Sequence, residues 1–304
     1  MDWKERIEKM ENDGKFAQAS RVFAYTFPNA SYVQKMQFAD RMFRGKAYEE
    51  AARWYEECIN TPIQEDYPYL TQTGEMEKDL PESVLVKIQS GDDLFRGKKF
   101  KAAAERYRAV ATLSSYARIK LAECFFLMKN YATAKEIYRR QAQETDDGYL
   151  AFMLGECYTY EVANEYAYEH AVYWYQYAYE RGCTYVYYPL GIAYQFGYGV
   201  EKDLNRAESL YKEGAKYPID RGNCYCKLGN FCYERGEYEK AKAYYQKAAD
   251  LNNAYALLNL AIGHLNRDLR TDKKLFVCYL AKSAALGNER ANELFQLLKK
   301  EREI

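Results

Sequence analysis

A short helical pattern that recurs along nearly the whole sequence most constrains what this chain can fold into. The pattern is an aromatic residue or Leu, then Ala three residues later, then an aromatic residue four residues after that. Its seven copies are Phe16-Ala19-Phe23, Tyr48-Ala51-Tyr55, Phe100-Ala103-Tyr107, Tyr131-Ala134-Tyr138, Tyr168-Ala171-Tyr175, Leu204-Ala207-Tyr211 and Tyr238-Ala241-Tyr245. Successive copies begin 32, 52, 31, 37, 36 and 34 residues apart. Such spacing predicts an array of repeats rather than one globular core.

Each repeat is predicted to be a pair of helices. Offsets of three and seven place the three residues of each copy on one helix stripe, where the small Ala lets a neighbouring helix approach. A second small-residue signature lies upstream, at Leu154-Gly155, Leu190-Gly191 and Leu228-Gly229, and in weaker form at Leu121-Ala122 and Phe38-Ala39. Glycines after apolar helical patterns predict C-terminal caps in the turns, at Gly14, Gly45, Gly97 and Gly236, with Asn130 taking that place once.

The repeats predict a single all-α solenoid over residues 1–304, with about eight helix pairs and a C-terminal capping helix. The interval of 52 residues contains Pro62, Pro68 and Pro81, which interrupt helical periodicity. We therefore expect an inserted loop at 60–82. The remaining predicted segments are repeats at 1–59, 83–147, 148–217 and 218–252, a degenerate repeat at 253–287 and the cap at 288–304.

One stretch closely resembles the Sel-one-like repeat consensus: Leu190-Gly191-Ile192-Ala193-Tyr194-Gln195-Phe196-Gly197-Tyr198-Gly199-Val200, followed by Asp203, Ala207 and Tyr211. The segment from Leu154 to Gly182 is similar to the same family, and Leu228 to Ala249 resembles a tetratricopeptide unit. On this resemblance 148–217 is Sel-one-like, whereas 1–59, 83–147 and 218–252 are tetratricopeptide-like. The resemblance implies a right-handed superhelix of stacked antiparallel helix pairs, whose first helices line a concave surface that binds proteins or peptides.

Composition narrows the classes of partner. Forty-four basic residues balance forty-four acidic ones, so no global field favours nucleic acid. No apolar run reaches the roughly 18 residues of a membrane helix and the first residues are charged, so we expect a soluble, cytoplasmic protein without a membrane partner. The eight cysteines contain no C-x-x-C pair, and the two histidines, His170 and His264, lack metal-site spacing. We predict neither a metal nor a cofactor.

The predicted concave-face positions are Asp40, Arg44, Asp92, Arg96, Glu123, Tyr149, Glu156, Tyr160, Tyr185, Tyr188 and Asn230. The string Phe43-Arg44-Gly45-Lys46 recurs as Phe95-Arg96-Gly97-Lys98, so its two arginines are expected one repeat apart. One interpretation is that each Asp supports its own helix by pairing with the Arg four residues later, worth about 0.2 to 0.5 kcal/mol. The other is that the arginines offer forked donors to carboxylates of a bound peptide. The acidic groups at these positions would repel a terminal carboxylate, which argues against a chaperone-tail clamp.

Tyrosine is the most unusual component, with 33 residues in all and 14 of them between Tyr149 and Tyr198. These side chains are candidates for an aromatic groove that binds an extended or proline-rich peptide. Alternatively, they occupy packing positions with the ring buried and the hydroxyl in water. The second interpretation is expected for Tyr158, Tyr175, Tyr194 and Tyr211.

These observations favour a protein-interaction scaffold or adaptor that binds a peptide or partner protein on its concave face. An alternative is a regulatory or substrate-binding subunit of a larger enzyme or envelope assembly. More remote alternatives are a nucleic-acid-binding repeat protein, which needs a basic stripe in register with the repeats, and an enzyme. We do not expect an enzyme, because no catalytic motif is present.

Overall fold

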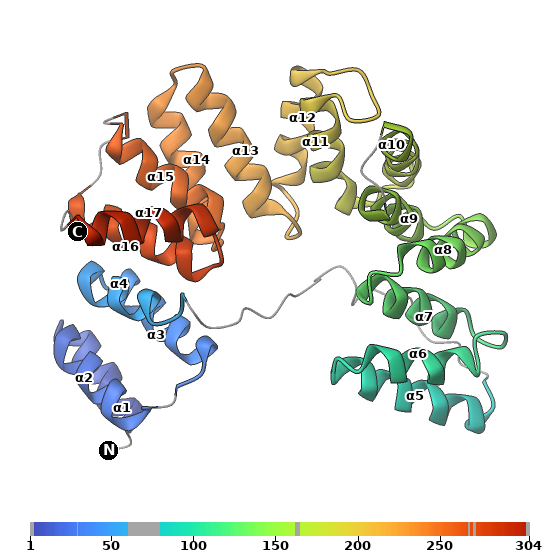
Figure 1. The fold of residues 1–304 in the computed structure, drawn as a ribbon, viewed down its shortest axis with the longest axis horizontal. Coiled ribbons are helices and arrows are strands. Elements are labelled where there is room, and N and C mark those ends of the chain that lie inside the picture. Colours follow the sequence, from blue (N-terminus) through green and yellow to red (C-terminus); the bar gives the residue numbers. More distant parts are fainter. Residues whose placement is uncertain are drawn as a thin grey trace. The chain divides into compact units, whose positions relative to one another are not determined.

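The computed structural model describes residues 3–28, 30–59, 80–161, 165–266, 268–269 and 272–301. Within these residues the chain forms seventeen α-helices, one short 3-10 helix and no strand (Figure 1). Their bounds are α1 (Trp3–Asn12), α2 (Phe16–Thr26), α3 (Tyr32–Arg44), α4 (Tyr48–Glu56), α5 (Glu82–Arg96), α6 (Phe100–Arg108), α7 (Ser115–Leu127), α8 (Tyr131–Thr145), α9 (Gly148–Glu161), α10 (Glu165–Glu180), η2 (Thr184–Val186), α11 (Tyr187–Phe196), α12 (Leu204–Gly214), α13 (Arg221–Glu234), α14 (Tyr238–Asp250), α15 (Ala254–Leu265), α16 (Lys273–Ala285) and α17 (Glu289–Lys300). The predicted all-α class is confirmed. Across the described ranges, every helix is too short or too polar to cross a membrane.

The helices pack in adjacent pairs, and the predicted small residues make this packing possible. Gly155, Gly191 and Gly229 each lie against the repeat's consensus tyrosine, and a Cβ atom there would come within 2.5, 2.4 and 2.5 Å of the ring. Those separations are far below van der Waals contact, so a larger residue does not fit without movement. Gly91 plays the same part against Tyr107, although the sequence analysis did not single it out.

The helix pairs belong to two compact units. Unit 1 contains Met1–Glu65 and Arg221–Ile304, and unit 2 contains Asp66–Asp220. In unit 2, helices α5 to α12 stack in chain order. In unit 1, however, α4 packs against α16, so the first repeats of the chain stack on the last ones (Figure 1).

Polar and aromatic contacts join α3 and α4 to α16 in unit 1. The Tyr32 hydroxyl donates to the Ala285 carbonyl at 2.9 Å, and the rings of Phe43 and Tyr279 lie 5.9 Å apart. The sequence predicts one array in chain order, yet here the apolar face of α4 is buried by a helix more than 200 residues later. The proline-containing insertion separates α4 from the next repeat, which leaves that face to α16.

Most of the predicted loop at 60–82 lies outside the described residues, and Glu82 already belongs to α5.

Helix α17 corresponds to the predicted cap. It begins after Asn288, whose side chain accepts a hydrogen bond from the Ala291 amide and caps the helix. It packs on α16, and Lys299 near its end forms an ion pair with Glu56 of α4. The cap therefore also contacts the N-terminal repeats, a contact that the sequence did not predict.

The turns follow the predicted pattern only in part. Gly14 and Gly236 adopt the left-handed backbone at φ 72° and 74°. In both copies of the Phe-Arg-Gly-Lys string, however, the left-handed residue is the lysine, with φ 60° at Lys46 and 56° at Lys98. Gly45 is needed for space instead, because a Cβ atom there would lie 2.4 Å from the Phe16 ring.

Candidate functional site

Several predicted concave-face residues accept a hydrogen bond from the consensus tyrosine of their own repeat. The donor and acceptor pairs are Tyr55 to Asp40 at 2.6 Å, Tyr107 to Asp92 at 2.7 Å, Tyr175 to Glu156 at 2.6 Å, Tyr211 to Gln195 at 2.9 Å and Tyr245 to Asn230 at 2.8 Å. We refer to these five acceptors as the acceptor ladder. We include Glu123, which accepts hydrogen bonds from Tyr149 and Lys120. The prediction of hydroxyls in water is therefore wrong for Tyr175 and Tyr211, because burial of the hydroxyl requires a protein partner.

A second donor usually reaches the acceptor ladder from a neighbouring repeat. Tyr116 donates to Asp92 at 3.1 Å, Tyr149 to Glu123 at 3.5 Å and Asn259 to Asn230 at 2.9 Å. Lys282 of α16 does the same for Asp40 at 2.7 Å. These side chains join one repeat to the next, which gives them a structural role that the sequence analysis did not foresee.

Two carboxylates of the acceptor ladder are buried. Glu123 is completely buried beside Lys120, whose ammonium lies 2.9 Å away, and burial raises the pKa of this carboxyl to about 7 despite that partner. Burial also raises the pKa of Glu156 to about 7, although the Tyr175 hydroxyl opposes the shift. Tyr185 is buried too. None of these three predicted site residues lies where a partner protein can reach it.

Replacing Glu156 with Gln is expected to stabilise the fold at pH 8 but not at pH 4. The folded-state pKa lies above the ordinary value of 4.5, so the folded protein holds its proton longer and loses stability as pH rises from about 4.5 to about 7. Gln keeps an acceptor for Tyr175 and removes the charge. Urea unfolding should show a gain of about 1 to 2 kcal/mol at pH 8. An equal gain at both pH values would contradict the assignment.

The remaining tyrosine candidates differ in their surroundings. Tyr149 belongs to the Glu123 network, and Tyr188 is half-buried, with its ring centre 6.1 Å from that of Tyr211. Tyr160 is 51% exposed and stacks on Tyr131 at 5.6 Å. Of the four tyrosines among the predicted concave-face positions, Tyr160 is the one with a largely exposed side chain.

The two matching arginines adopt the same local arrangement. The Nε atom of Arg44 donates to the backbone carbonyl of Asp40 at 3.3 Å, and that of Arg96 donates to the carbonyl of Asp92 at 3.4 Å. The predicted side-chain pairing at i, i+4 does not form, because each Asp carboxylate binds tyrosine instead. Arg96 also pairs with Asp93 at 2.6 Å.

Arg44 and Arg96 belong to different units. Arg44 lies in unit 1 and Arg96 in unit 2, and the helix of unit 1 that stacks on the α3–α4 pair is α16. The expectation that the two guanidinium groups are one repeat apart stays a prediction. Each arginine has to be considered with the residues of its own unit.

Arg44 lines a pocket of about 410 Å³ inside unit 1, which we name the α3–α16 pocket. Its lining residues are Asp40, Phe43 and Arg44 of α3, Gln246, Ala249 and Asp250 of α14, Asn252 of the following turn, Leu257 of α15 and Lys282 of α16. The pocket therefore combines two sequence-predicted residues with residues more than 200 positions away in the chain.

Two of the charged side chains in the α3–α16 pocket compensate each other. The Lys282 ammonium is nearly buried, pairs with Asp40 and lies 5.3 Å from the centre of the Phe43 ring. Asp250 accepts a hydrogen bond from the neutral amide of Gln246 at 2.9 Å, which leaves its negative charge in place. Neutralisation of Asp40 by Lys282 removes much of the repulsion that an acidic residue would exert on a bound carboxylate.

Arg44 forms no ion pair among the described residues. Its side chain is exposed, its guanidinium donates a hydrogen bond to the Asp40 carbonyl, and it interacts with the Glu11 carboxylate only through its charge. The outer edge of the guanidinium group therefore keeps forked N–H donors for a carboxylate. Phe43, Ala249 and Leu257 provide an apolar wall nearby.

Neither a metal centre nor a disulfide is found in the part of the chain that the structure describes. No group of three or more His, Cys, Asp or Glu side chains is placed to hold a metal ion there. All eight cysteines are free thiols, and all but Cys183 are buried. Burial raises the pKa of several of these thiols, for example to about 12 at Cys124, whereas an activated thiol nucleophile has a lowered pKa.

Comparison with known proteins identifies the class of fold. No protein-family model matches the sequence, and no curated protein matches it. A protective antigen of uropathogenic Escherichia coli with an SLR fold aligns with a TM-score of 0.59 at 20% identity, over 95% of this chain and 62% of the antigen. This chain thus spans less than two thirds of that protein.

Two further structures support the same class. A Sel1 repeat protein from Oxalobacter formigenes aligns with a TM-score of 0.54 at 20% identity, over 70% of this chain and 87% of its own. PilF of Pseudomonas aeruginosa has the same score and identity over 71% and 97%. The chain therefore has the tetratricopeptide and Sel1-like helical-repeat fold, as the motif from Leu190 to Val200 predicts.

Proposed function

We propose that this protein is a non-catalytic interaction scaffold that binds a peptide with an acidic side chain in the α3–α16 pocket. The helical-repeat class supports a general role in protein interaction. The single observation that carries the finer proposal is the exposed guanidinium of Arg44, which forms no ion pair among the described residues, at a pocket where Lys282 pairs with Asp40.

The size and composition of the pocket favour a peptide segment over a folded domain. A volume of about 410 Å³ accommodates a few side chains. An acidic side chain would pair with Arg44, and an adjacent apolar side chain would lie against Phe43 and Leu257. Because Lys282 is paired with Asp40, Arg44 is the cation that would bind the acidic side chain.

Arg44→Glu is expected to abolish partner capture, whereas Arg96→Glu is not. The two arginines share the same local sequence and the same bond to a helix carbonyl, so Arg96 is a matched control. Tagged full-length protein would capture partners from a lysate of its own organism, and mass spectrometry would quantify each of them. We expect the partner that binds this pocket to fall at least about tenfold with Arg44→Glu, as loss of a charge-assisted pair would produce.

A partner that both variants retain would contradict the pocket assignment, as would one that both lose equally. If the partner that depends on Arg44 is an enzyme subunit, the scaffold is a regulatory or substrate-binding component of that enzyme. Absence of any stoichiometric partner would count against a scaffold altogether.

A further inference from the structure

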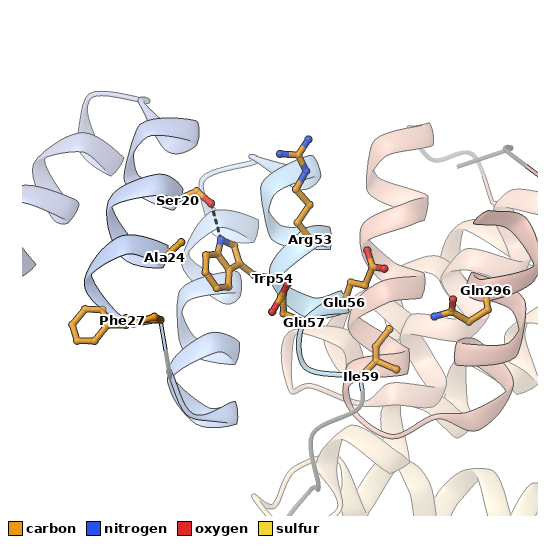
Figure 2. Close-up of a pocket in the computed structure, with 10 residues that line it drawn as sticks. Ser20, Ala24, Phe27, Arg53, Trp54, Glu56, Glu57, Ile59 and Gln296 are labelled. Atoms are coloured by element: carbon orange, nitrogen blue, oxygen red, sulfur yellow. Dashed lines mark hydrogen bonds between the residues drawn. The ribbon is translucent and has the colours of Figure 1, made fainter. Parts of the chain in front are cut away.

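A second, larger hollow lies on the second-helix face of unit 1. Figure 2 shows α4 at its centre, with Ser20 and Ala24 of α2 and Phe27 just after it on one side and Gln296 of α17 on the other. Its volume is about 770 Å³, almost twice that of the α3–α16 pocket. We name it the α4 trough, and its lining residues are Ser20, Ala24, Phe27, Pro28, Arg53, Trp54, Glu56, Glu57, Ile59 and Gln296.

The floor of the α4 trough is held in place by Trp54. The indole N–H donates to the Ser20 hydroxyl at 2.8 Å (Figure 2). The same ring packs edge-on against Phe23 and Phe38, with centroid distances of 5.0 and 5.4 Å. Trp54 is only 9% exposed, so a ligand in the trough would meet the edge of a ring that is already fixed, and little ordering is required on binding.

Small side chains line the side of the trough that α2 forms. Ser20 and Ala24 are one helical turn apart and both are small, and the Ala24 methyl is exposed. A helix backbone can therefore approach α2 closely along this line. Phe27 at the end of α2 and Ile59 beyond α4 add apolar surface.

The charged side chains around the trough differ in whether they form ion pairs. Glu57 pairs with Lys35 at 3.2 Å, and Glu56 pairs with Lys299 of α17. Arg53 is exposed and has no ion-pair or side-chain hydrogen-bond partner among the described residues. Both lining carboxylates are compensated while the lining guanidinium is not, so the trough presents one uncompensated positive charge near the partly exposed apolar side chains of Phe27 and Ile59.

We propose that the α4 trough binds an amphipathic helix of a partner protein, with apolar residues on Phe27, Ile59 and the exposed edge of Trp54 and an acidic residue paired with Arg53. Two flanking helices and a central floor have the shape of a groove that receives a helix. The uncompensated guanidinium sets the charge of the ligand. This surface lies on the second helices and is separate from the α3–α16 pocket, so it does not depend on the function proposed above.

The test uses a display library of amphipathic helical peptides with either Glu or Lys beside a variable apolar stripe, selected against the full chain. We expect the selected peptides to carry Glu and to bind at least about tenfold more weakly to Ala24→Arg, which fills the trough from an exposed position. Arg53→Glu should weaken them similarly and should prefer the Lys counterpart of the same peptide. Arg44→Glu, in the other pocket, should bind them like the wild type.

Three results would overturn the proposal. The first is selected peptides that bind Ala24→Arg as tightly as the wild type while circular dichroism shows the variant folded. The second is a library that yields no helical peptides with Glu, or wild-type affinity that is equal for Glu and Lys peptides. The third is concentration-dependent self-association that Ala24→Arg abolishes, which would assign the trough to a second copy of this chain.

Discussion

Replacing Asp40 with Ala is expected to lower the opening free energy of α16, measured by amide hydrogen exchange, by about 2 to 4 kcal/mol. The change removes the carboxylate that compensates Lys282, whose side chain is only 7% exposed. It also leaves the Tyr55 hydroxyl without its 2.6 Å acceptor. An uncompensated, nearly buried ammonium group is the larger of the two penalties.

Two variants separate these effects. Asp40→Ala combined with Lys282→Met should recover about half of the loss or more, because Met removes the charge and still fills the space beside Phe43 and Tyr55. Asp92→Ala, at the equivalent position of unit 2, should cost its repeat less, since Asp92 binds tyrosine hydroxyls rather than a lysine. If the double variant is as unstable as Asp40→Ala, the ion pair does not hold the α3 and α16 helices together.

Gly229→Ala should destabilise unit 1 by about 2 to 3 kcal/mol, although Ala is the better helix former by about 1 kcal/mol. The added Cβ atom would lie 2.5 Å from the Tyr245 ring. That ring is buried and its hydroxyl is bonded to Asn230, so it has little freedom to move. Hydrogen exchange of α13 and α14 amides would report the loss.

Gly222→Ala is the matched control because it makes the same change two turns earlier in α13. A Cβ atom there meets Asn253 and Leu251 at 3.5 Å, an ordinary contact distance. We expect no loss of stability and a gain of up to about 1 kcal/mol. Equal destabilisation by both substitutions would show that close packing against tyrosine is not what requires a small residue at Gly229.

Local sequence patterns predicted the elements of this fold because the repeat itself is local. Each helix pair has its small residue and tyrosine within about twenty positions, so motifs such as Leu190-Gly191 followed by Tyr211 contain both sides of the contact. The acceptor ladder was also accessible, since Asp40, Asp92 and Asn230 all precede their tyrosine by 15 residues. This regular spacing was the signal that the first interpretation of the acidic residues missed.

The candidate site was less predictable because its residues come from distant parts of the chain. Arg44 was identified from its own helix, whereas Gln246, Asp250 and Lys282 join it only when α16 packs on α4. A repeat pattern does not indicate which helix will pack on the exposed face of the repeat that precedes an insertion. The α4 trough escaped prediction for the same reason, since α17 provides one of its walls.

The packing of α4 on α16 also determines how long α4 stays uncovered while the chain is being synthesised. The ribosome completes α4 at Glu56 and does not begin α16 until Lys273. At about 5 to 20 residues per second, the N-terminal repeats wait roughly 10 to 40 s before their covering helix exists. During that interval the aromatic and small side chains that later face α16 are exposed. The face that its own last repeats will occupy is therefore open to other molecules until synthesis reaches α16.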